Sequence, residues 1–252
     1  MHSVDELFDV VAREEDDVRW AAIQELRAIS TPGVFERASA LCNSSNPAER
    51  ITGAEILGEL DTFADRACDI LCAMLGDGDA TVVEAAVHAL AQRQDERAID
   101  ALTPAATHEA PNVRWAVATA LGDLIADERA EKVLLALMRD PDPSVRDRAT
   151  FAVGSLSDHD SPRIRAALAE RLRDDDPAVA GEAALGLARR RDARAIPFIA
   201  TAVESADSEI EEAAEEITAP DMLRDLLKAR DALGDAMGLQ QLIARCRARL
   251  EA

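Results

Sequence analysis

The chain has 252 residues, of which 49 are acidic and 28 basic, so its formal net charge at pH 7 is −21. Apolar residues make up 48% of the sequence and aromatic residues only 3%, which predicts a folded chain with a core of small and aliphatic side chains. The acidic excess disfavours binding to nucleic acids and to anionic membranes, because both attract basic surfaces.

Residues 1–17 contain several acids and lack the basic region and apolar run of a signal peptide. No uninterrupted apolar stretch is long enough to cross a bilayer. Four cysteines in a chain of this length do not make a disulfide framework. We therefore expect a cytoplasmic protein with reduced thiols. Only Lys132 and Lys228 are lysines, and acid-rich, lysine-poor surfaces are typical of salt-loaded cytoplasm, so the acidity indicates either a halophilic source or a basic partner.

An internal repeat covers almost the whole chain. Seven nine-residue segments align without gaps, with starts 31 to 34 residues apart. The segments begin at Val18, Glu49, Val82, Val113, Val145, Val179 and Ile210. Their fifth position is always small or slight, and their ninth is aliphatic except for Thr218. This spacing predicts an amphipathic helix in each segment, with small residues where neighbouring backbones approach closely.

Helix-starting residues precede each segment: Asp16, Asn46-Pro47, Asp79, Pro111, Asp140 to Pro143, Asp176-Pro177 and Asp207-Ser208. A second apolar-periodic stretch lies between segments, as at 127–140, 161–174 and 192–203. The repeating unit is therefore predicted to be two helices joined by short turns, and no segment shows the alternation typical of a strand.

Two helices of this size cannot bury an apolar face alone, so we expect the units to stack. The predicted fold is an all-α, right-handed α-solenoid of about seven helix pairs that forms one domain over residues 1–252. Residues 4–14 are expected to form an N-terminal capping helix, 15–218 the repeats and 219–252 the C-terminal capping helices. Gly234 and Gly238 are expected to divide the last stretch. Its cluster Arg245, Arg247 and Arg249 suits a structural role at a helix C-terminus.

The pattern D-P-x-V-R-x-x-A-x-x-A-L-G, as in DPSVRDRATFAVG (142–154) and PNVRWAVATALG (111–122), resembles the HEAT-like repeats of the PBS lyase family. The resemblance covers nearly all of the chain and weakens in the second and seventh repeats. It is specific for the fold rather than for the function, because the fold hosts scaffolds, inhibitors and a few enzymes.

The second position carries arginine in four repeats: Arg19, Arg50, Arg114 and Arg146. This ladder of arginines could bind anionic ligands, or it could pair with acids of the inter-helix turns and tie one repeat to the next. The candidate acids are Asp16, Asp79, Asp140 and Asp142. The resemblance implies the structural role.

Positions 3 and 7 fall on one helix face, opposite the buried stripe, and the resemblance implies that this face lines a concave surface. The candidate partner-binding residues there are Trp20, Ile51, Glu55, Glu84, His88, Trp115, Asp147, Phe151 and Leu185. The two tryptophans are either binding anchors or partial core folded over a neighbouring helix. At 8–10 Å per stacked layer they lie roughly 25–30 Å apart, which suits an extended partner, and the interleaved acids favour a basic one.

Enzyme signatures are weak. Cys68 and Cys72 lie one helical turn apart without a further zinc-ligand pair. His108-Glu109 resembles the His-Glu pairs of the di-iron enzyme deoxyhypusine hydroxylase, but that family needs several such pairs and this chain has one. Phosphate-loop, nucleophile-elbow and H-E-x-x-H motifs do not occur. We therefore predict no catalytic residue, no metal and no cofactor.

These patterns predict a non-catalytic scaffold or adaptor that binds a protein or peptide on its concave face. The alternative is a bilin lyase-like or tetrapyrrole-handling protein, which the resemblance implies and in which Arg148 beside Phe151 would contribute. A resemblance to the HEAT-like alkylpurine DNA glycosylases is disfavoured, because those need a basic face for phosphates.

Overall fold

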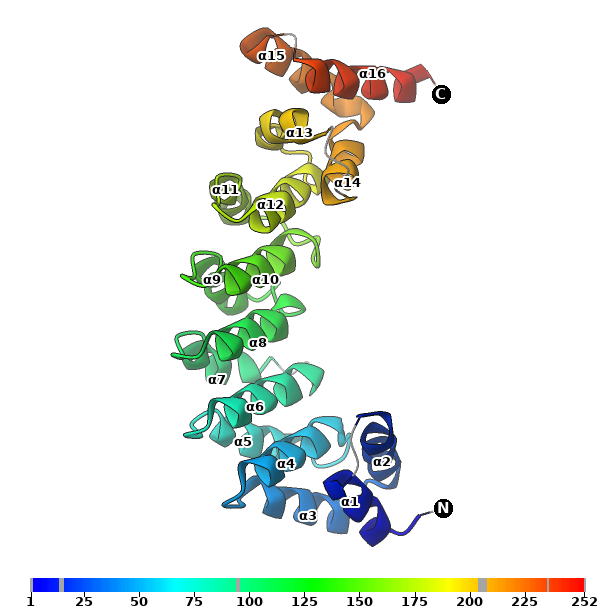
Figure 1. Ribbon diagram of the computed structural model, residues 1–252, viewed down its shortest axis with the longest axis vertical. Coiled ribbons are helices and arrows are strands. Elements are labelled where there is room, and N and C mark those ends of the chain that lie inside the picture. Colours follow the sequence, from blue (N-terminus) through cyan, green and yellow to red (C-terminus); the bar gives the residue numbers. More distant parts are fainter. Residues whose placement is uncertain (1, 14–15, 94–95, 204–207, 235, 252) are drawn as a thin grey trace. The chain divides into compact units, whose positions relative to one another are not determined.

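The computed structural model describes residues 2–13, 16–93, 96–203, 208–234 and 236–251. Within these ranges every regular element is helical and no strand occurs (Figure 1). The predicted all-α, solenoid-type fold is therefore confirmed. The chain divides into two compact units, unit 1 (Met1–Leu124) and unit 2 (Ile125–Ala252). That one continuous array runs through both units stays a prediction.

Unit 1 contains four consecutive helix pairs. They are α1 (Val4–Arg13) with α2 (Asp16–Ile29), α3 (Pro32–Cys42) with α4 (Pro47–Glu59), α5 (Ala64–Met74) with α6 (Ala80–Arg93), and α7 (Ala98–Ala105) with α8 (Pro111–Gly122). The second helices α4, α6 and α8 pack side by side, and α3, α5 and α7 form the other layer (Figure 1). The predicted N-terminal capping helix is α1, which packs on α2 as the first helix of the first pair.

Unit 2 contains three further pairs and a C-terminal extension. The pairs are α9 (Glu128–Leu137) with α10 (Pro143–Gly154), α11 (Pro162–Arg171) with α12 (Pro177–Arg189), and α13 (Ile196–Ala202) with α14 (Ser208–Ile217). Short 3-10 turns at Ala193–Ala195 and Pro220–Met222 precede α13 and α15 (Leu223–Leu233), and α16 (Met237–Glu251) ends the chain. The described pairs thus number seven, as the repeat predicts.

The C-terminal stretch divides at only one of the two expected glycines. Gly234 ends α15 with a φ of 87°, a conformation that favours glycine. Gly238 instead lies inside α16, where a Cβ would collide with the carbonyl oxygen of Ala200 on α13. Its small size therefore serves packing of α16 against α13 rather than a chain break. Arg245 pairs with Glu211 at 2.8 Å and Arg249 binds the Glu215 carbonyl at 2.6 Å, consistent with structural roles.

The core follows the repeat positions. All seven residues at the fifth position and all seven at the ninth are buried. Thr218 fits the buried ninth position because its hydroxyl donates to the carbonyl oxygen of Ala214 at 2.8 Å. At Gly53 an added Cβ would lie 2.7 Å from the backbone nitrogen of Cys42 and 2.8 Å from the oxygen of Ala38. The fifth position is therefore small because the backbones of α3 and α4 meet there.

The turns before the second helices use the expected caps. Asn46, Asp142 and Asp176 accept hydrogen bonds from the backbone nitrogens two residues later, with Pro at the next position. Asp79 likewise accepts from the Thr81 nitrogen at 2.9 Å. The Asp16 side chain and Asp207 lie outside the described residues, so their expected capping roles stay predictions.

Two arginines of the ladder, Arg50 and Arg146, bind aspartates of the inter-helix turns, but not the carboxylates that were expected. Arg50 binds both carboxylate oxygens of Asp77 at 2.8 Å, and Arg146 binds Asp174 at 2.8 Å. These aspartates precede the helix caps by two residues, whereas the predicted partner Asp79 caps α6. The predicted Asp142 likewise caps α10, and Asp140 offers Arg146 its backbone carbonyl at 3.0 Å.

The turn geometry explains this offset. Asp77 accepts the backbone N–H of Asp79 at 2.9 Å, and Asp174 accepts that of Asp176 at 3.1 Å. Each carboxylate therefore shapes its own turn while it binds an arginine of the preceding pair. The other two ladder arginines bind nearby groups: Arg19 pairs with Glu55, and Arg114 donates to the carbonyls of His108 and Glu109.

The contact between α3 and α4 predicts a size limit at Gly53. Gly53→Ala should lower the free energy of unfolding by about 3 kcal/mol, because the added methyl group forces two backbones apart. Gly78→Ala is the control, since a Cβ there meets nothing within 4 Å. Chemical denaturation measures both changes, and equal stability of the two variants would contradict the close approach.

The ion pair of Arg146 and Asp174 predicts a dependence on pH. Burial alone would raise the pKa of the Asp174 carboxyl, but hydrogen bonds from Arg146 and the Asp176 N–H outweigh burial, and the pKa is lowered. Such a carboxyl contributes stability above its unfolded pKa of about 3.9 and loses the contribution as the pH falls through the folded pKa.

Asp174→Asn should therefore destabilise the protein by about 3 kcal/mol at pH 7, because Arg146 is left without its carboxylate. The difference from wild type should shrink as the pH falls below about 4. The exposed pair of Arg66 and Glu36 provides the control, and Glu36→Gln should cost less than about 1 kcal/mol. Urea denaturation across this pH range tests both expectations; a difference that is unchanged at acid pH would refute the assignment.

Candidate functional site: the second-helix face

The third and seventh positions of α2, α4, α6 and α8 form one accessible surface of unit 1, here named the second-helix face. Its residues are Trp20, Gln24, Ile51, Glu55, Glu84, His88, Trp115 and Thr119. All eight are exposed or half-buried, although the fifth and ninth positions beside them are buried. The face thus lies open where the repeat pattern predicts.

The two tryptophans differ in their surroundings. Trp20 on α2 is 47% exposed, which is unusual for so large an apolar side chain. Trp115 on α8 is half-buried, and its ring meets that of His88 on α6 edge-on, with 6.5 Å between centroids and 62° between planes. Trp20 is therefore the more accessible of the two tryptophans, and Trp115 is partly covered by its neighbour.

Cross-helix contacts hold the carboxylates of the face in place. Glu55 on α4 pairs with Arg19 on α2, and Glu84 on α6 accepts a hydrogen bond from Asn112 on α8. Gln24 on α2 donates to Glu59 on α4 at 3.1 Å. These contacts connect α2 to α4 and α6 to α8, so the acidic groups are held in defined orientations.

Three adjoining pockets make a groove along the exposed side of α4, here named the α4 groove. The N-terminal pocket, about 550 Å³, is lined by Ile51 and Glu55 together with apolar residues of α1 and α3. The middle pocket, about 200 Å³, lies between α4 and α6 and shares Glu55 with the first. The C-terminal pocket, about 310 Å³, shares Gln92 with the middle one. Each pocket therefore shares one lining residue with the next pocket along α4.

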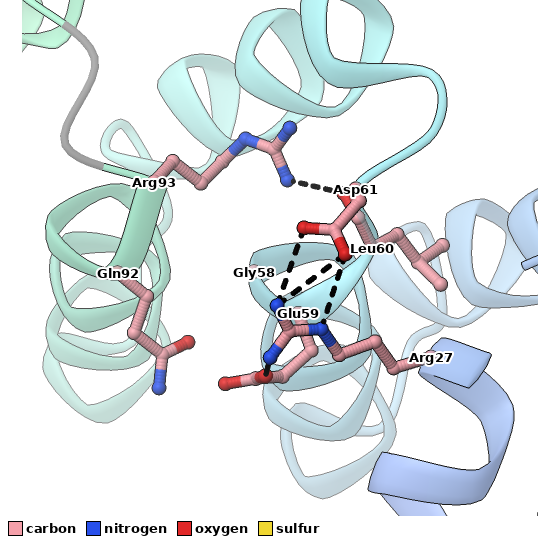
Figure 2. Close-up of a pocket in the computed structure, with 7 residues that line it drawn as sticks. All are labelled: Arg27, Gly58, Glu59, Leu60, Asp61, Gln92 and Arg93. Atoms are coloured by element: carbon pink, nitrogen blue, oxygen red, sulfur yellow. Dashed lines mark hydrogen bonds and ion pairs between the residues drawn. The ribbon is translucent and has the colours of Figure 1, made fainter.

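The C-terminal pocket surrounds the end of α4 (Figure 2). Arg93 reaches from α6 to the carbonyl oxygens of Leu57 at 2.8 Å and Leu60 at 2.9 Å. Arg27 reaches from α2 to Asp61 at 3.3 Å. Both cations lie where the last carbonyls of a helix carry partial negative charge. They therefore stabilise the end of α4 as well as line the pocket.

The role of Arg93 was missed in the sequence analysis, and it recurs in unit 2. Arg190 is 9% exposed, and its guanidinium binds five backbone carbonyls, among them those of Gly154 at 2.9 Å and Val153 at 2.7 Å. Burial lowers the pKa of Arg190. Both arginines stand three residues after the ninth repeat position, where most repeats have an apolar residue. An arginine at this mostly apolar position was the sequence signal that could have predicted the role.

In unit 2 the predicted face is not continuous. Asp147 and Phe151 on α10 are half-buried, and the Arg148 guanidinium lies 5.1 Å from the centre of the Phe151 ring. Leu185 on α12, expected to be accessible, is 4% exposed and belongs to the core. The reason is that α12 is rich in Ala and Gly, so its neighbours close over it; a Cβ on Gly186 would lie 2.6 Å from the Cα of Gly154 on α10.

Helix α12 in unit 2 carries a buried carboxylate, Glu182. Glu182 on α12 is 8% exposed and accepts a hydrogen bond from Ser155 at 2.7 Å. Burial and the nearby Asp147 and Glu212 raise the pKa of Glu182. Burial and Asp176 raise the pKa of Asp147 as well. The repeat pattern gave no signal for Glu182, because its position falls between the open and the buried rows.

The residues considered for chemistry have local structural partners. His108 accepts the backbone N–H of Ala110 at 3.1 Å through Nδ1 and so shapes the turn before α8. The sulfur atoms of Cys68 and Cys72 face each other at 3.9 Å on α5. Across the described ranges, no group of three or more His, Cys, Asp or Glu side chains could hold a metal ion. None of the described helices is long and apolar enough to cross a membrane.

Several known proteins are similar to this chain. Protein YibA of Escherichia coli (strain K12) is 29% identical over 205 residues, which cover 77% of this chain and 72% of that protein. The X-ray structure of YibA superposes with a TM-score of 0.75 at 26% identity and covers 98% of this chain and 93% of that one. The complex of CpcE and CpcF of phycocyanin lyase from Nostoc sp. PCC7120 has a TM-score of 0.48 at 20% identity, with 98% and 95% covered.

A family model for HEAT repeats matches residues 4–91, 77–154 and 130–219. These matches overlap and together span all seven described helix pairs. The chain therefore belongs to the HEAT-repeat family.

Proposed function

We propose that this protein is a non-catalytic cytoplasmic scaffold that binds a protein or peptide on the second-helix face of unit 1. The observation that carries the proposal is Trp20, which stands 47% exposed on that face. Stacked helical repeats present extended surfaces to their partners, and aromatic residues are enriched among the residues that dominate binding energy.

The contacts of the face support binding rather than catalysis. Glu55 and Glu84 are held by Arg19 and Asn112 on neighbouring helices. His88 lies against the Trp115 ring and 3.8 Å from Glu84. These contacts position the side chains in two groups, one on α2 and α4 and one on α6 and α8, which favours recognition of a shaped surface.

The tetrapyrrole alternative has weaker support. It needs an aromatic-lined groove with arginines free to meet propionate groups. Arg148 instead lies over the ring of Phe151, and the neighbouring Leu185 is buried. Scaffold binding on unit 1 is therefore the function we favour.

Trp20→Ala should weaken partner binding by about 2 kcal/mol, roughly 30-fold, because a central aromatic anchor is lost. Trp115→Ala should weaken it less, since His88 already covers part of that ring. Affinity capture from the native cytoplasm at its own ionic strength, with quantitative mass spectrometry, identifies the partner, and titration calorimetry then gives the affinities.

Leu156→Ala provides the control, because Leu156 is an exposed apolar residue, 42% accessible, in unit 2 and outside the proposed face. Its capture profile should match that of wild type. If Trp20→Ala and Trp115→Ala leave both the captured proteins and their affinities unchanged, the proposed site is wrong.

A further inference from the structure

We infer that the α4 groove binds an extended peptide segment of the partner and that its middle pocket receives one arginine or lysine side chain of that segment. This inference rests on the proposed function and specifies the chemistry of the partner. It follows from the size of the pocket, from the free oxygens on its two walls and from the two pockets that adjoin it.

The size of the middle pocket suits a single side chain. Its volume of about 200 Å³ is below the ~300–1,000 Å³ of sites for drug-sized ligands. Glu55 projects from α4, while Glu84 and His88 belong to α6. Ala85 and Ala89 add small apolar surface against which the methylene groups of a long basic side chain can pack.

Each glutamate of the pocket keeps one oxygen for a ligand. Arg19 binds Oε2 of Glu55, and Asn112 binds Oε2 of Glu84. Oε1 of Glu84 lies 3.8 Å from His88 Nε2, which is beyond hydrogen-bond distance. Within the described residues, the two Oε1 atoms therefore stay available to accept from a guanidinium or ammonium group.

The charge of the pocket selects a basic occupant. Its lining contains two carboxylates and neither arginine nor lysine. A guanidinium group offers five donors and can bridge acceptors on opposite walls. An acidic side chain would meet two like charges there, and a purely apolar one would leave the Oε1 atom of each carboxylate without water or partner.

The groove on either side extends the site to a peptide. The N-terminal pocket is lined by the half-buried Ile51 and by three arginines, Arg13, Arg19 and Arg37, whose guanidinium groups can donate to peptide carbonyls. At the other end, the exposed Gln92 lines both the middle and the C-terminal pocket. Its side-chain amide has no hydrogen-bond partner among the described residues. An amide can both donate to and accept from a peptide backbone. The 13 residues of α4 span about 20 Å, which matches about six residues of extended chain.

The test uses the full chain labelled with ¹⁵N and a synthetic hexapeptide with one central arginine between apolar residues, acetylated and amidated at its ends. Matched peptides carry citrulline, which has the same shape without the charge, or lysine. We expect the arginine peptide to shift amide signals of α4 and α6 and to bind at least 10-fold more tightly than the citrulline peptide. The lysine peptide should also bind more tightly than the citrulline peptide.

Glu84→Gln and Glu55→Gln should each weaken binding of the arginine peptide about 10-fold and leave binding of the citrulline peptide unchanged. Glu36→Gln, at an exposed glutamate of α3 outside the groove, should change neither. Because Glu55 also pairs with Arg19, a thermal melt checks that variant, and Glu84→Gln tests the pocket without disturbing that pair.

Equal binding of the arginine and citrulline peptides, or an unchanged affinity in Glu84→Gln, would overturn this inference. The scaffold proposal would still stand if Trp20→Ala abolished capture of the natural partner. The opposite outcome is also distinguishable. If peptide binding depends on the charge but Trp20→Ala and Trp115→Ala leave partner capture unchanged, the pocket is supported and the partner binds away from Trp20.

Discussion

The contact between helix backbones at the fifth repeat position is the constraint on which the rest of the structure depends. At Gly53, α3 and α4 approach so closely that a methyl group would strike backbone atoms of Cys42 and Ala38. This contact fixes which side of each second helix is buried. Positions 3 and 7 of the same helices in unit 1 therefore remain accessible, and Trp20 and the α4 groove belong to that accessible side.

Many of the charged side chains bind other groups of the protein and so stabilise the helix stack, rather than remaining free for a ligand. Asp77 and Asp174 shape their turns while they bind an arginine of the preceding pair, and Arg93 and Arg190 bind the carbonyls at the ends of helices. Many charges of this acidic chain are thus engaged within it. The middle pocket of the groove differs, because two glutamates there each retain an unbonded oxygen among the described groups.

Helix positions, buried rows and most turn caps could be predicted from the sequence because they depend on spacing within one repeat. The partners of Arg50 and Arg146 could not, since acids occur at both Asp77 and Asp79 and only the turn conformation separates their roles. The burial of Leu185 depends on how closely α10 and α12 approach, which no single repeat reveals. The groove was also missed, because its walls come from different repeats.

The central claim is that the natural partner lies against the second-helix face of unit 1. Photo-cross-linking in living cells tests it most directly, with a benzophenone amino acid in place of the half-buried Ile51 on the face or of the exposed Glu36 on α3. The account predicts a discrete cross-linked product from position 51 and none from position 36. Cross-links to the same partner from position 36, with none from position 51, would contradict it.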